Sequence, residues 1–293
     1  MEAPGAARCI PEDARRPFVI AGPCVLEGEA MALRVAESLA AACRARGLAY
    51  VFKASYMKDN RTAEGAYSGP GLAAGLALLA RVRREVGVPV LTDVHAVDEV
   101  APAAEAVDIL QVPAFLCRQT RLLRACAASG RAVNIKKGQF LAMRDIARAV
   151  EKARAARPQA EILLTERGTF FGYHDLVVDM RAIAYMRTLG ARVVFDVTHA
   201  LQHPGCGGCR EFARPLARAG LGAGAEGIFA EVHPDPPRAL SDATTQLALA
   251  DAPALIDEWA RLGDLVRGLE GEGPRGLTPG DEAPQGAAPG GGS

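Results

Sequence analysis

The sequence predicts a single-domain (β/α)8 barrel, the TIM-barrel architecture of the α/β class, and three observations support this prediction. Short segments rich in β-branched residues alternate eight times with longer amphipathic segments between residues 17 and 270. Each short segment is apolar on both faces until its last residues, which is typical of a parallel strand covered by helices. Roughly 250 residues is also the usual length of such a barrel.

A doubly wound open sheet is the structural alternative, because it also alternates parallel strands with helices. Such a sheet normally carries a glycine-rich dinucleotide-binding turn after its first strand. The corresponding segment here, AGPCVLEGE at residues 21–29, does not match that pattern. The sequence therefore favours the closed barrel.

The predicted strands and helices follow one another along the chain in strict alternation. The strands cover residues 18–24, 49–55, 89–95, 109–112, 132–137, 161–167, 192–199 and 227–233. The helices cover residues 31–47, 71–87, 97–106, 121–130, 144–156, 179–190, 210–220 and 252–270. Several of the helical segments end in glycine, which is a common stop signal for an α-helix.

The two ends of the chain differ from the predicted barrel, which we assign to residues 17–270. Residues 1–16 are weakly patterned and form a predicted N-terminal extension without the apolar stretch of a secretory signal. Residues 271–293 contain 8 glycines and 4 prolines and are predicted to be a disordered tail. Seven scattered cysteines do not resemble a disulfide framework, so we expect a cytoplasmic protein with reduced thiols.

The charge balance is informative about possible partners. There are 34 basic and 34 acidic side chains, which argues against a general nucleic-acid binder, and no apolar run is long enough for a membrane span. Only five of the basic residues are lysines. Because an ammonium and a guanidinium are not interchangeable, a lysine retained in such an arginine-rich chain is a candidate for a specific role.

Polar side chains gather at the carboxyl ends of the predicted strands, where the active site of a TIM barrel is built. No similar set occurs at the amino ends of the strands, so we predict a small-molecule site at the barrel mouth. The set comprises Cys24, Lys53, Asp93, His95, Gln111, Asn134, Lys136, Arg167, Asp196, His199 and Glu231.

The first group within this set is cationic, and four of the five lysines belong to it. Several cations in or after neighbouring strands create a local positive field in a neutral protein, which indicates a substrate with carboxylate and phosphate groups. Ordinary ion pairing with Asp and Glu is the alternative. The group comprises Lys53, Lys58, Arg61, Arg118, Lys136, Lys137 and Arg167.

The second group has the chemistry of metal ligands. Cys24, His199 and Glu231 lie on predicted strands that are neighbours in a closed barrel, and Asp242 lies eleven residues after Glu231. A thiolate, an imidazole and two carboxylates suit a divalent ion such as Zn²⁺, Fe²⁺, Mn²⁺ or Co²⁺. Spacing alone leaves open that Cys24 is a buried, inert cysteine.

Cys206 and Cys209 form a CxxC motif in a glycine-rich segment. Such a motif could be a redox pair or half of a zinc site, but there is no second CxxC or CxxH partner. We interpret the segment as a mobile loop with two incidental thiols, and nearby His203 as a solvated loop histidine.

Eight segments of the chain resemble the 3-deoxy-D-manno-octulosonate 8-phosphate synthase family. The resemblance runs in order from about residue 17 to 268 and implies a homotetrameric barrel. It also implies a transferase that forms a C–C bond between phosphoenolpyruvate and D-arabinose 5-phosphate for lipopolysaccharide synthesis, releasing inorganic phosphate. The segments are AGPCVLE, YVFKASYMKDNR, LTDVH, QVPAFLCRQT, AVNIKKGQF, LTERGTFFGYHDLVVDM, FDVTHALQ and AEVHPDPPRALSDATTQL.

The resemblance also implies roles for individual residues. Cysteine at position 24 is typical of the metal-dependent branch of this family, whose ligands correspond to Cys24, His199, Glu231 and Asp242. Lys136 and Arg167, with Ala114, Phe115, Lys53 and Lys58, would hold phosphoenolpyruvate. Asn60, Arg61 and Thr62 would hold the sugar phosphate, and Arg118 would reach a neighbouring subunit. We predict Lys53, Asp93, Lys136 and His199 as catalytic, and Gln111 and Asn134 as further substrate-binding residues.

The sequence departs from the family at three places. Asp59 adds a negative charge beside the predicted phosphate site, His174 and Asp175 replace the usual NN or DN pair, and the loop after His199 is shorter. The main functional alternative is the sister synthase that uses erythrose 4-phosphate. Thr62 resembles that enzyme, whereas Asn60 at its proline position favours the five-carbon sugar. A non-catalytic thiol or metal sensor using Cys206 and Cys209 is the alternative from another class.

Overall fold

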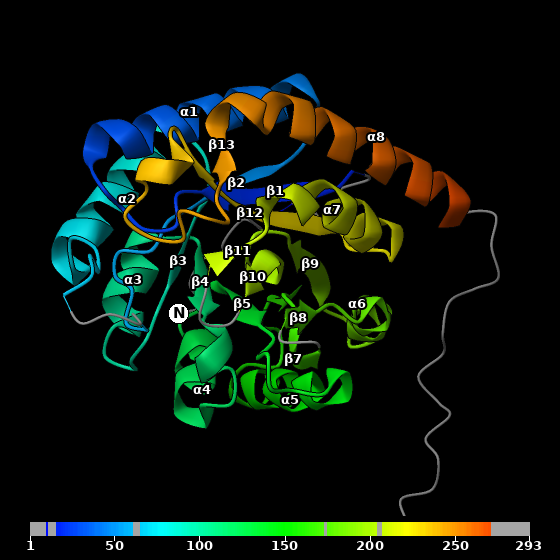
Figure 1. Cartoon of the computed structure of the whole chain (residues 1–293). Coiled ribbons are helices and arrows are strands. Elements are labelled where there is room, and N and C mark those ends of the chain that lie inside the picture. Colours follow the sequence, from blue (N-terminus) through cyan, green and yellow to red (C-terminus); the bar gives the residue numbers. More distant parts are fainter. Residues whose placement is uncertain (1–9, 11–15, 61–64, 173–174, 204–206, 271–293) are drawn as a thin grey trace, which may run out of the picture.

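A computed structural model describes residues 10, 16–60, 65–172, 175–203 and 207–270 of the chain. Eight parallel strands form a barrel with helices around it, as predicted (Figure 1). Each barrel strand pairs with the next in the order β1, β2, β3, β4, β5, β6, β9 and β12. The barrel closes because β12 also pairs with β1, from Phe18 opposite Gly227 to Gly22 opposite Glu231.

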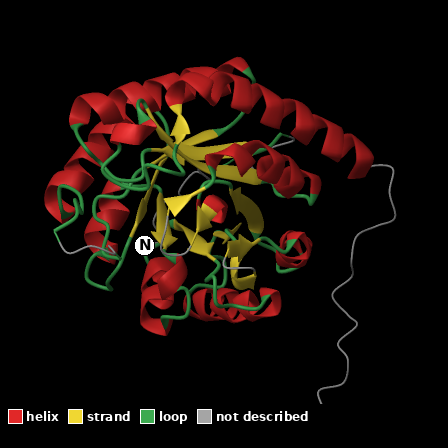
Figure 2. Ribbon diagram, viewed as in Figure 1, coloured by secondary structure: helices red, strands yellow, loops and turns green. Residues whose placement is uncertain are grey.

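The elements lie close to their predicted positions. The barrel strands are β1 (Phe18–Gly22), β2 (Tyr50–Lys53), β3 (Val90–Asp93), β4 (Ile109–Val112), β5 (Ala132–Lys136), β6 (Ile162–Glu166), β9 (Arg192–Asp196) and β12 (Gly227–His233). The helices are α1 (Glu29–Ala45), α2 (Leu72–Val86), α3 (Val100–Ala106), α4 (Thr120–Ala128), α5 (Ala147–Ala156), α6 (Met180–Arg187), α7 (Ala213–Gly222) and α8 (Ala252–Glu270). Figure 2 shows the strands in yellow inside a ring of red helices.

Three additions at the carboxyl ends of the strands were not predicted. β7 (Thr169–Gly172) and β8 (Asp175–Val177) form one antiparallel pair after β6. β10 (Gln202–His203) and β11 (Gly207–Gly208) form a second antiparallel pair after β9. The short strand β13 (Leu247–Ala248) extends the sheet beside the end of β12.

The lower part of the barrel interior is filled by one cluster of apolar side chains, which we call the barrel floor. Successive side chains of a strand point to opposite faces. The strand residues next to each floor residue, such as Val19 and Phe52, therefore point outward and pack under the helices. The floor therefore seals the amino-terminal end of the barrel. Its members are Ile10, Phe18, Ile20, Val51, Leu91, Ile109, Ala132, Leu163, Val194 and Phe229.

A second set of inward residues lies above the floor, and we call it the polar layer. Its members are Lys53, Asp93, Gln111, Asn134, Thr165, Asp196 and Glu231. Each of them follows a floor residue on its own strand by two positions, so it points into the same interior one level higher. All seven are buried. The strand period thus places charged and polar groups inside the protein, directly above an apolar base.

The strand β1 contributes no side chain to the polar layer. Gly22 occupies the corresponding position, two residues after Ile20. A Cβ atom at Gly22 would lie 2.1 Å from the backbone oxygen of Lys53. Glycine is therefore required there, because β1 and β2 approach each other closely beside the buried lysine.

The predicted N-terminal extension, apart from Ile10 and Arg16, and the predicted tail lie outside the described residues. None of the helices in the described part of the chain is both long and apolar enough to cross a bilayer.

Candidate active site

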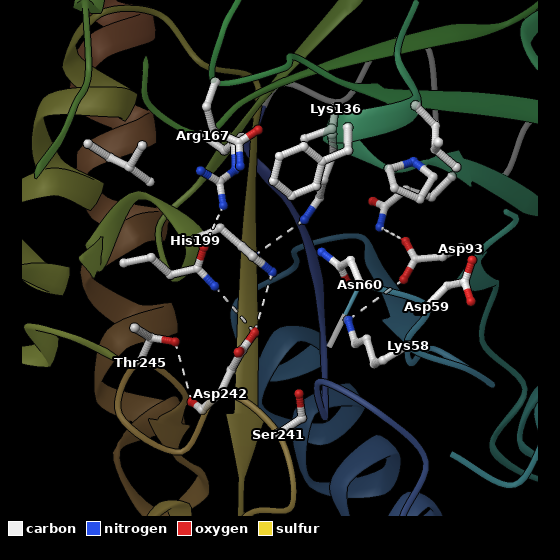
Figure 3. A pocket seen from close by; sticks show the side chains of 18 of the residues that line it. Lys58, Asp59, Asn60, Asp93, Lys136, Arg167, His199, Ser241, Asp242 and Thr245 are labelled. Carbon is white, nitrogen blue, oxygen red and sulfur yellow. Dashed lines mark hydrogen bonds and ion pairs between the residues drawn. The ribbon is translucent and has the colours of Figure 1, made fainter. Parts of the chain in front are cut away.

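A pocket of about 720 Å³ opens at the carboxyl ends of the barrel strands (Figure 3). The loops that follow the strands form its walls, as in other barrels of this architecture. Eleven residues predicted for the site line this pocket, and Asp59 lines it too. They are Lys53, Lys58, Asn60, Asp93, Gln111, Ala114, Phe115, Lys136, Arg167, His199 and Asp242.

The remaining predicted residues lie in three different places. Cys24, Asn134 and Glu231 are fully buried and support the pocket from behind. Arg118 is exposed outside the pocket, where its backbone oxygen accepts a hydrogen bond from Lys152. Arg61, Thr62, His174 and Cys206 lie outside the described residues.

A chain of hydrogen bonds runs around the interior from β2 to β6. The hydroxyl of Ser55 and the amide of Gln111 both donate to the carboxylate of Asp93. The amide of Asn134 donates to Gln111 at 2.7 Å, and Thr165 donates to Asn134 at 2.7 Å. Because every member is buried and partnered, these side chains have little freedom to reorient.

Asp93 is ionised within this chain of hydrogen bonds. Burial would raise its pKa, but the ammonium groups of Lys58 and Lys53 outweigh that effect and hold the pKa well below its ordinary range. Lys58 Nζ lies 3.8 Å from Asp93 and 3.8 Å from Glu231, and it faces the pocket in Figure 3. One cation thus links the wall of the pocket to two buried carboxylates.

A second buried ion pair joins Lys53 to Glu231. Lys53 Nζ donates to Oε1 of Glu231 at 2.7 Å and to the backbone oxygen of Cys24 at 3.0 Å. Burial would raise the pKa of Glu231, but the nearby charges, led by Lys53, reverse the effect and keep the pKa below its ordinary range. Oε2 of Glu231 is buried and has no hydrogen-bond partner among the described residues.

Lys136 lies over the centre of the floor. Its Nζ donates to Asp196 at 2.7 Å, lies 3.4 Å from Nδ1 of His199 and sits 3.8 Å from the ring centre of Phe229. Burial lowers the pKa of Lys136, although Asp196 partly compensates. Asp196 also holds the imidazole directly, since its carboxylate lies 2.8 Å from Nδ1 of His199.

Arg167 presents an unused donor to the pocket. Its Nη2 donates to Gln202 at 2.6 Å, while Nη1 is buried without a hydrogen-bond partner in the described part of the chain. Burial lowers the pKa of this guanidinium. An unpaired buried donor on a cation costs free energy, which an anion in the pocket would recover.

Three of the four predicted metal ligands converge. Cys24, Glu231 and Asp242 offer ligand atoms that all lie within 4.8 Å of one another. His199 approaches the same point, because its Nε2 lies 3.7 Å from Glu231 and 3.8 Å from Asp242. Burial and the charge of Glu231 raise the pKa of the Cys24 thiol, so a thiolate there needs a nearby cation. With the unpartnered oxygen of Glu231, this donor set fits a divalent transition metal.

Asp242 reaches this point through an unusual backbone. Its φ of 48° is the one positive value at a non-glycine residue in the described chain. Aspartate tolerates the left-handed region better than most residues. The backbone oxygen of Asp242 accepts from the amides of Thr245 and Gln246 at 3.0 and 3.1 Å, which fixes the loop.

Sequence reasoning missed Gln202, which bridges two parts of the site. Its oxygen accepts from Arg167, and its Nε2 donates to Asp242 at 3.4 Å. Gln202 belongs to the segment FDVTHALQ that carries the family resemblance, so the sequence contained a signal for it.

The structure differs from our interpretation of one lysine, Lys137, and one histidine, His203. Lys137, which we grouped with the cations of the mouth, is buried and donates to Thr169 at 2.9 Å beside Glu166. It is turned away because successive strand residues face opposite sides. His203, interpreted as solvated, is half-buried and contacts both Asp175 and Cys209.

Comparisons with known proteins show which proteins the chain is similar to. A family model described as the DAHP synthetase I family matches residues 8–266. A 2-dehydro-3-deoxyphosphooctonate aldolase of Pelobacter propionicus is 52% identical over 249 residues, which is 83% of this chain and 91% of the relative. Proteins of the same name from Syntrophotalea carbinolica and Cupriavidus taiwanensis are 52% and 48% identical over 85% of this chain, covering 92% and 90% of their own lengths.

Proposed function

Since the chain belongs to the DAHP synthetase I family, we propose that it condenses phosphoenolpyruvate with D-arabinose 5-phosphate. The products are 3-deoxy-D-manno-octulosonate 8-phosphate, a precursor of lipopolysaccharide, and inorganic phosphate. The names of the relatives support this reaction. Within the structure, the observation that carries it is the buried, unpaired Nη1 of Arg167 in a pocket that also holds Lys136.

Arg167 and Lys136 are the proposed anchors for phosphoenolpyruvate. A guanidinium presents parallel donors to a carboxylate or phosphate, and one of those donors is unused here. Lys136 adds a second positive charge on the neighbouring strand end. Ala114 and Phe115 line the adjacent wall and give it an apolar surface.

Lys58 and Asn60 are the proposed contacts for the sugar phosphate. Both face the pocket on the loop after β2, opposite the Arg167 side (Figure 3). Asp93 fixes Lys58 from behind, so the ammonium is held in place before the substrate arrives. Two anionic substrates therefore approach one another from opposite walls, which favours bond formation through proximity.

The reaction joins carbon 3 of the enol phosphate to the aldehyde carbon of the sugar. Water then adds at carbon 2, and phosphate leaves by cleavage of the C–O bond. Lys136 and Arg167 neutralise the negative charge that the substrate carries through these steps, which mainly aids binding and orientation. Asp196 holds Lys136 and His199 together, so a proton at Nζ of Lys136 is close to a second group that can accept it.

Cys24, His199, Glu231 and Asp242 would hold a divalent ion, which could be Zn²⁺, Fe²⁺, Mn²⁺ or Co²⁺. When bound, such an ion supplies a Lewis acid that can polarise the aldehyde. Lys53 pairs with Glu231 and thereby positions one of the four ligands.

A cytoplasmic homotetramer completes the proposal. The many reduced thiols expected from the sequence support the compartment, and the family resemblance supports the assembly. Arg118 is exposed beside the mouth, where it could reach a site in a neighbouring subunit.

Measurement of phosphate release from phosphoenolpyruvate tests the function. We expect release with arabinose 5-phosphate and little release with erythrose 4-phosphate. A preference for erythrose 4-phosphate would assign the sister reaction instead, and metal binding without any release would favour the sensor alternative. A chelator should abolish release, and Zn²⁺, Fe²⁺, Mn²⁺ or Co²⁺ should restore it. If turnover stayed complete after the metal content fell to zero, the proposed metal site would be rejected, and the proposed synthase activity would stand.

A further inference from the structure

Three side chains outside the proposed catalytic machinery form a relay on the rim of the pocket. Nε2 of His203 lies 2.7 Å from Sγ of Cys209, and Nδ1 of the same ring contacts the carboxylate of Asp175. Asp175 begins β8, His203 ends β10, and Cys209 follows β11. The two antiparallel pairs after β6 and β9 therefore meet at His203.

The two nitrogens of His203 have different partners, and this defines what the group can do. A carboxylate at Nδ1 keeps the ring proton on that nitrogen and leaves Nε2 as an acceptor. The acceptor faces a thiol, so the Cys209 proton can move to the ring and leave a thiolate beside an imidazolium. The two contacts lie on opposite sides of the ring. One metal ion bound to a single nitrogen of His203 therefore cannot also reach both Cys209 and Asp175.

Three other described cysteines, none of them a proposed metal ligand, provide a contrast within the same molecule. Cys43, Cys117 and Cys126 are buried, and burial raises the pKa of each thiol, to about 12 for Cys43 and Cys126. Cys209 is partly exposed, and the side chain of His203 is 29% exposed. A small reagent can therefore reach Cys209, whereas the buried thiols remain protonated and covered.

The relay also adjoins residues of the proposed active site. Gln202, which bridges Arg167 and Asp242, is the immediate neighbour of His203 on β10. The backbone amide of Cys209 donates to Leu201 at 3.1 Å, on the other side of Gln202. A change in the position of Cys209 would therefore also move the short segment that carries Gln202.

We propose that Cys209 is a nucleophilic thiol, activated by His203 and Asp175, and a site of covalent modification by peroxides and other small soft electrophiles. With a peroxide, the thiolate attacks one oxygen, an S–O bond forms and the O–O bond breaks. Sulfur loses two electrons and becomes a sulfenic acid, while the released hydroxide takes the proton from His203 and leaves as water. The assignment does not depend on the proposed synthase activity, since it concerns the thiol alone.

Alkylation of the whole folded chain with iodoacetamide at pH 7 tests the proposal, with each labelled cysteine identified by peptide mass spectrometry. Only a few per cent of an ordinary thiol is ionised at this pH, so full ionisation raises the thiolate fraction roughly 30-fold. A less basic thiolate is also less nucleophilic, which leaves a net gain of about five- to tenfold. We expect H203A to slow labelling of Cys209 by that factor and D175N to slow it by about half as much.

D179N is the matched control, because it removes a partly exposed carboxylate four residues after Asp175 that contacts Arg181 rather than His203. It should leave the labelling rate unchanged, and circular dichroism should show all three variants folded. Peroxide followed by dimedone should mark Cys209 in the parent chain and not in H203A. Labelling of Cys209 at the same rate in H203A, or faster labelling of another cysteine, would overturn the assignment.

Discussion

The floor and the polar layer of this barrel are built from the same strands, and each polar residue lies two positions after a floor residue. Leu91 and Asp93 are both inward residues of β3, but one packs among apolar side chains and the other binds cations. The floor excludes water and has no charge of its own. The layer above it contains ion pairs that are stable because the groups are partnered within a buried environment.

This difference separates what the fold needs from what the chemistry needs. Burial of the floor residues stabilises the closed barrel through the hydrophobic effect, whichever reaction takes place above it. The polar layer costs free energy to bury and is held in place by the floor beneath it. Substitutions in the two levels should therefore affect different measurements.

The largest effect is expected at Arg167. R167A removes the guanidinium that would bind the proposed anion, so kcat/KM should fall about 1,000-fold, or about 4 kcal/mol. Steady-state phosphate release measures this loss. R124A, on the exposed side of α4, is the matched control and should leave kcat/KM within twofold of the parent. An R167A enzyme of nearly normal kcat/KM would refute the anchoring role.

A floor substitution should show the opposite behaviour. L91A leaves a cavity below the site and should lower the free energy of unfolding by about 3 kcal/mol, while both KM values stay within twofold. Guanidinium chloride unfolding gives the first quantity and steady-state kinetics the second. L265A, at a leucine that is 60% exposed on α8, should change stability by less than about 0.5 kcal/mol. If L91A altered KM strongly, the two levels would not be separable.

Removal of the Cys24 thiol tests the metal ligands at the edge of the polar layer. C24A should lower both metal content and turnover, the latter about 100-fold, because one of four donors is lost. Elemental analysis and phosphate release measure the two effects. C126A removes a buried thiol on α4 instead and should retain metal and turnover. Full activity of C24A would reject the proposed ligand set.

The buried carboxylates should make the polar layer sensitive to acid. The pKa of Asp196 in the folded chain is held well below its ordinary value by His199 and Lys136, despite the burial that would raise it. The unfolded chain binds this proton first, so stability is complete above about pH 4 and falls as the pH drops further. Each such group changes the free energy of unfolding by up to about 1.4 kcal/mol per pH unit.

Unfolding by guanidinium chloride between about pH 2.5 and 6 measures this dependence, since those values bracket the carboxylate pKa of the unfolded chain. D196N should be less stable at pH 6 and should show a shallower loss on acidification. An unchanged slope would mean that Asp196 titrates alike in the folded and unfolded chains.

The smallest effect is expected at Asp59, an exposed carboxylate in the pocket wall. D59N removes a charge that repels the sugar phosphate, so KM for arabinose 5-phosphate should fall about threefold. The gain should shrink as salt is added, because the group is accessible to counter-ions. Initial-rate measurements at two ionic strengths show both results, and a rise in KM would contradict the repulsion.

The sequence predicted the barrel and the polar side chains at the carboxyl ends of its strands, but not the division of the interior into a floor and a polar layer. Each strand is apolar until its end, and the period of two places Lys53, Asp93 and Asp196 on the inner face. The position of Gly22 required the structure, since its reason is a backbone contact with a distant strand. Spacing along the sequence also could not predict that Asp242 lies close to Cys24, because the left-handed backbone at Asp242 is a property of the folded loop.

Residues on the loops were harder to predict than those on the strands. Gln202 and His203 follow the regular part of β9, where no strand period specifies the direction of a side chain. Their partners Arg167 and Asp175 come from another loop, so the contacts arise only when the two antiparallel pairs meet. The motif around Cys209 therefore suggested incidental thiols, because its partners His203 and Asp175 precede the motif in the sequence.

The ion pair between Lys53 and Glu231 has a consequence for the order of events during biogenesis. A zinc finger cannot fold until its metal arrives, because the metal supplies the free energy of folding. In this barrel, the ammonium of Lys53 already neutralises the most deeply buried carboxylate of the proposed ligand set. The nascent chain thus carries its own counter-ion, so we expect the apoprotein to fold before any ion is bound.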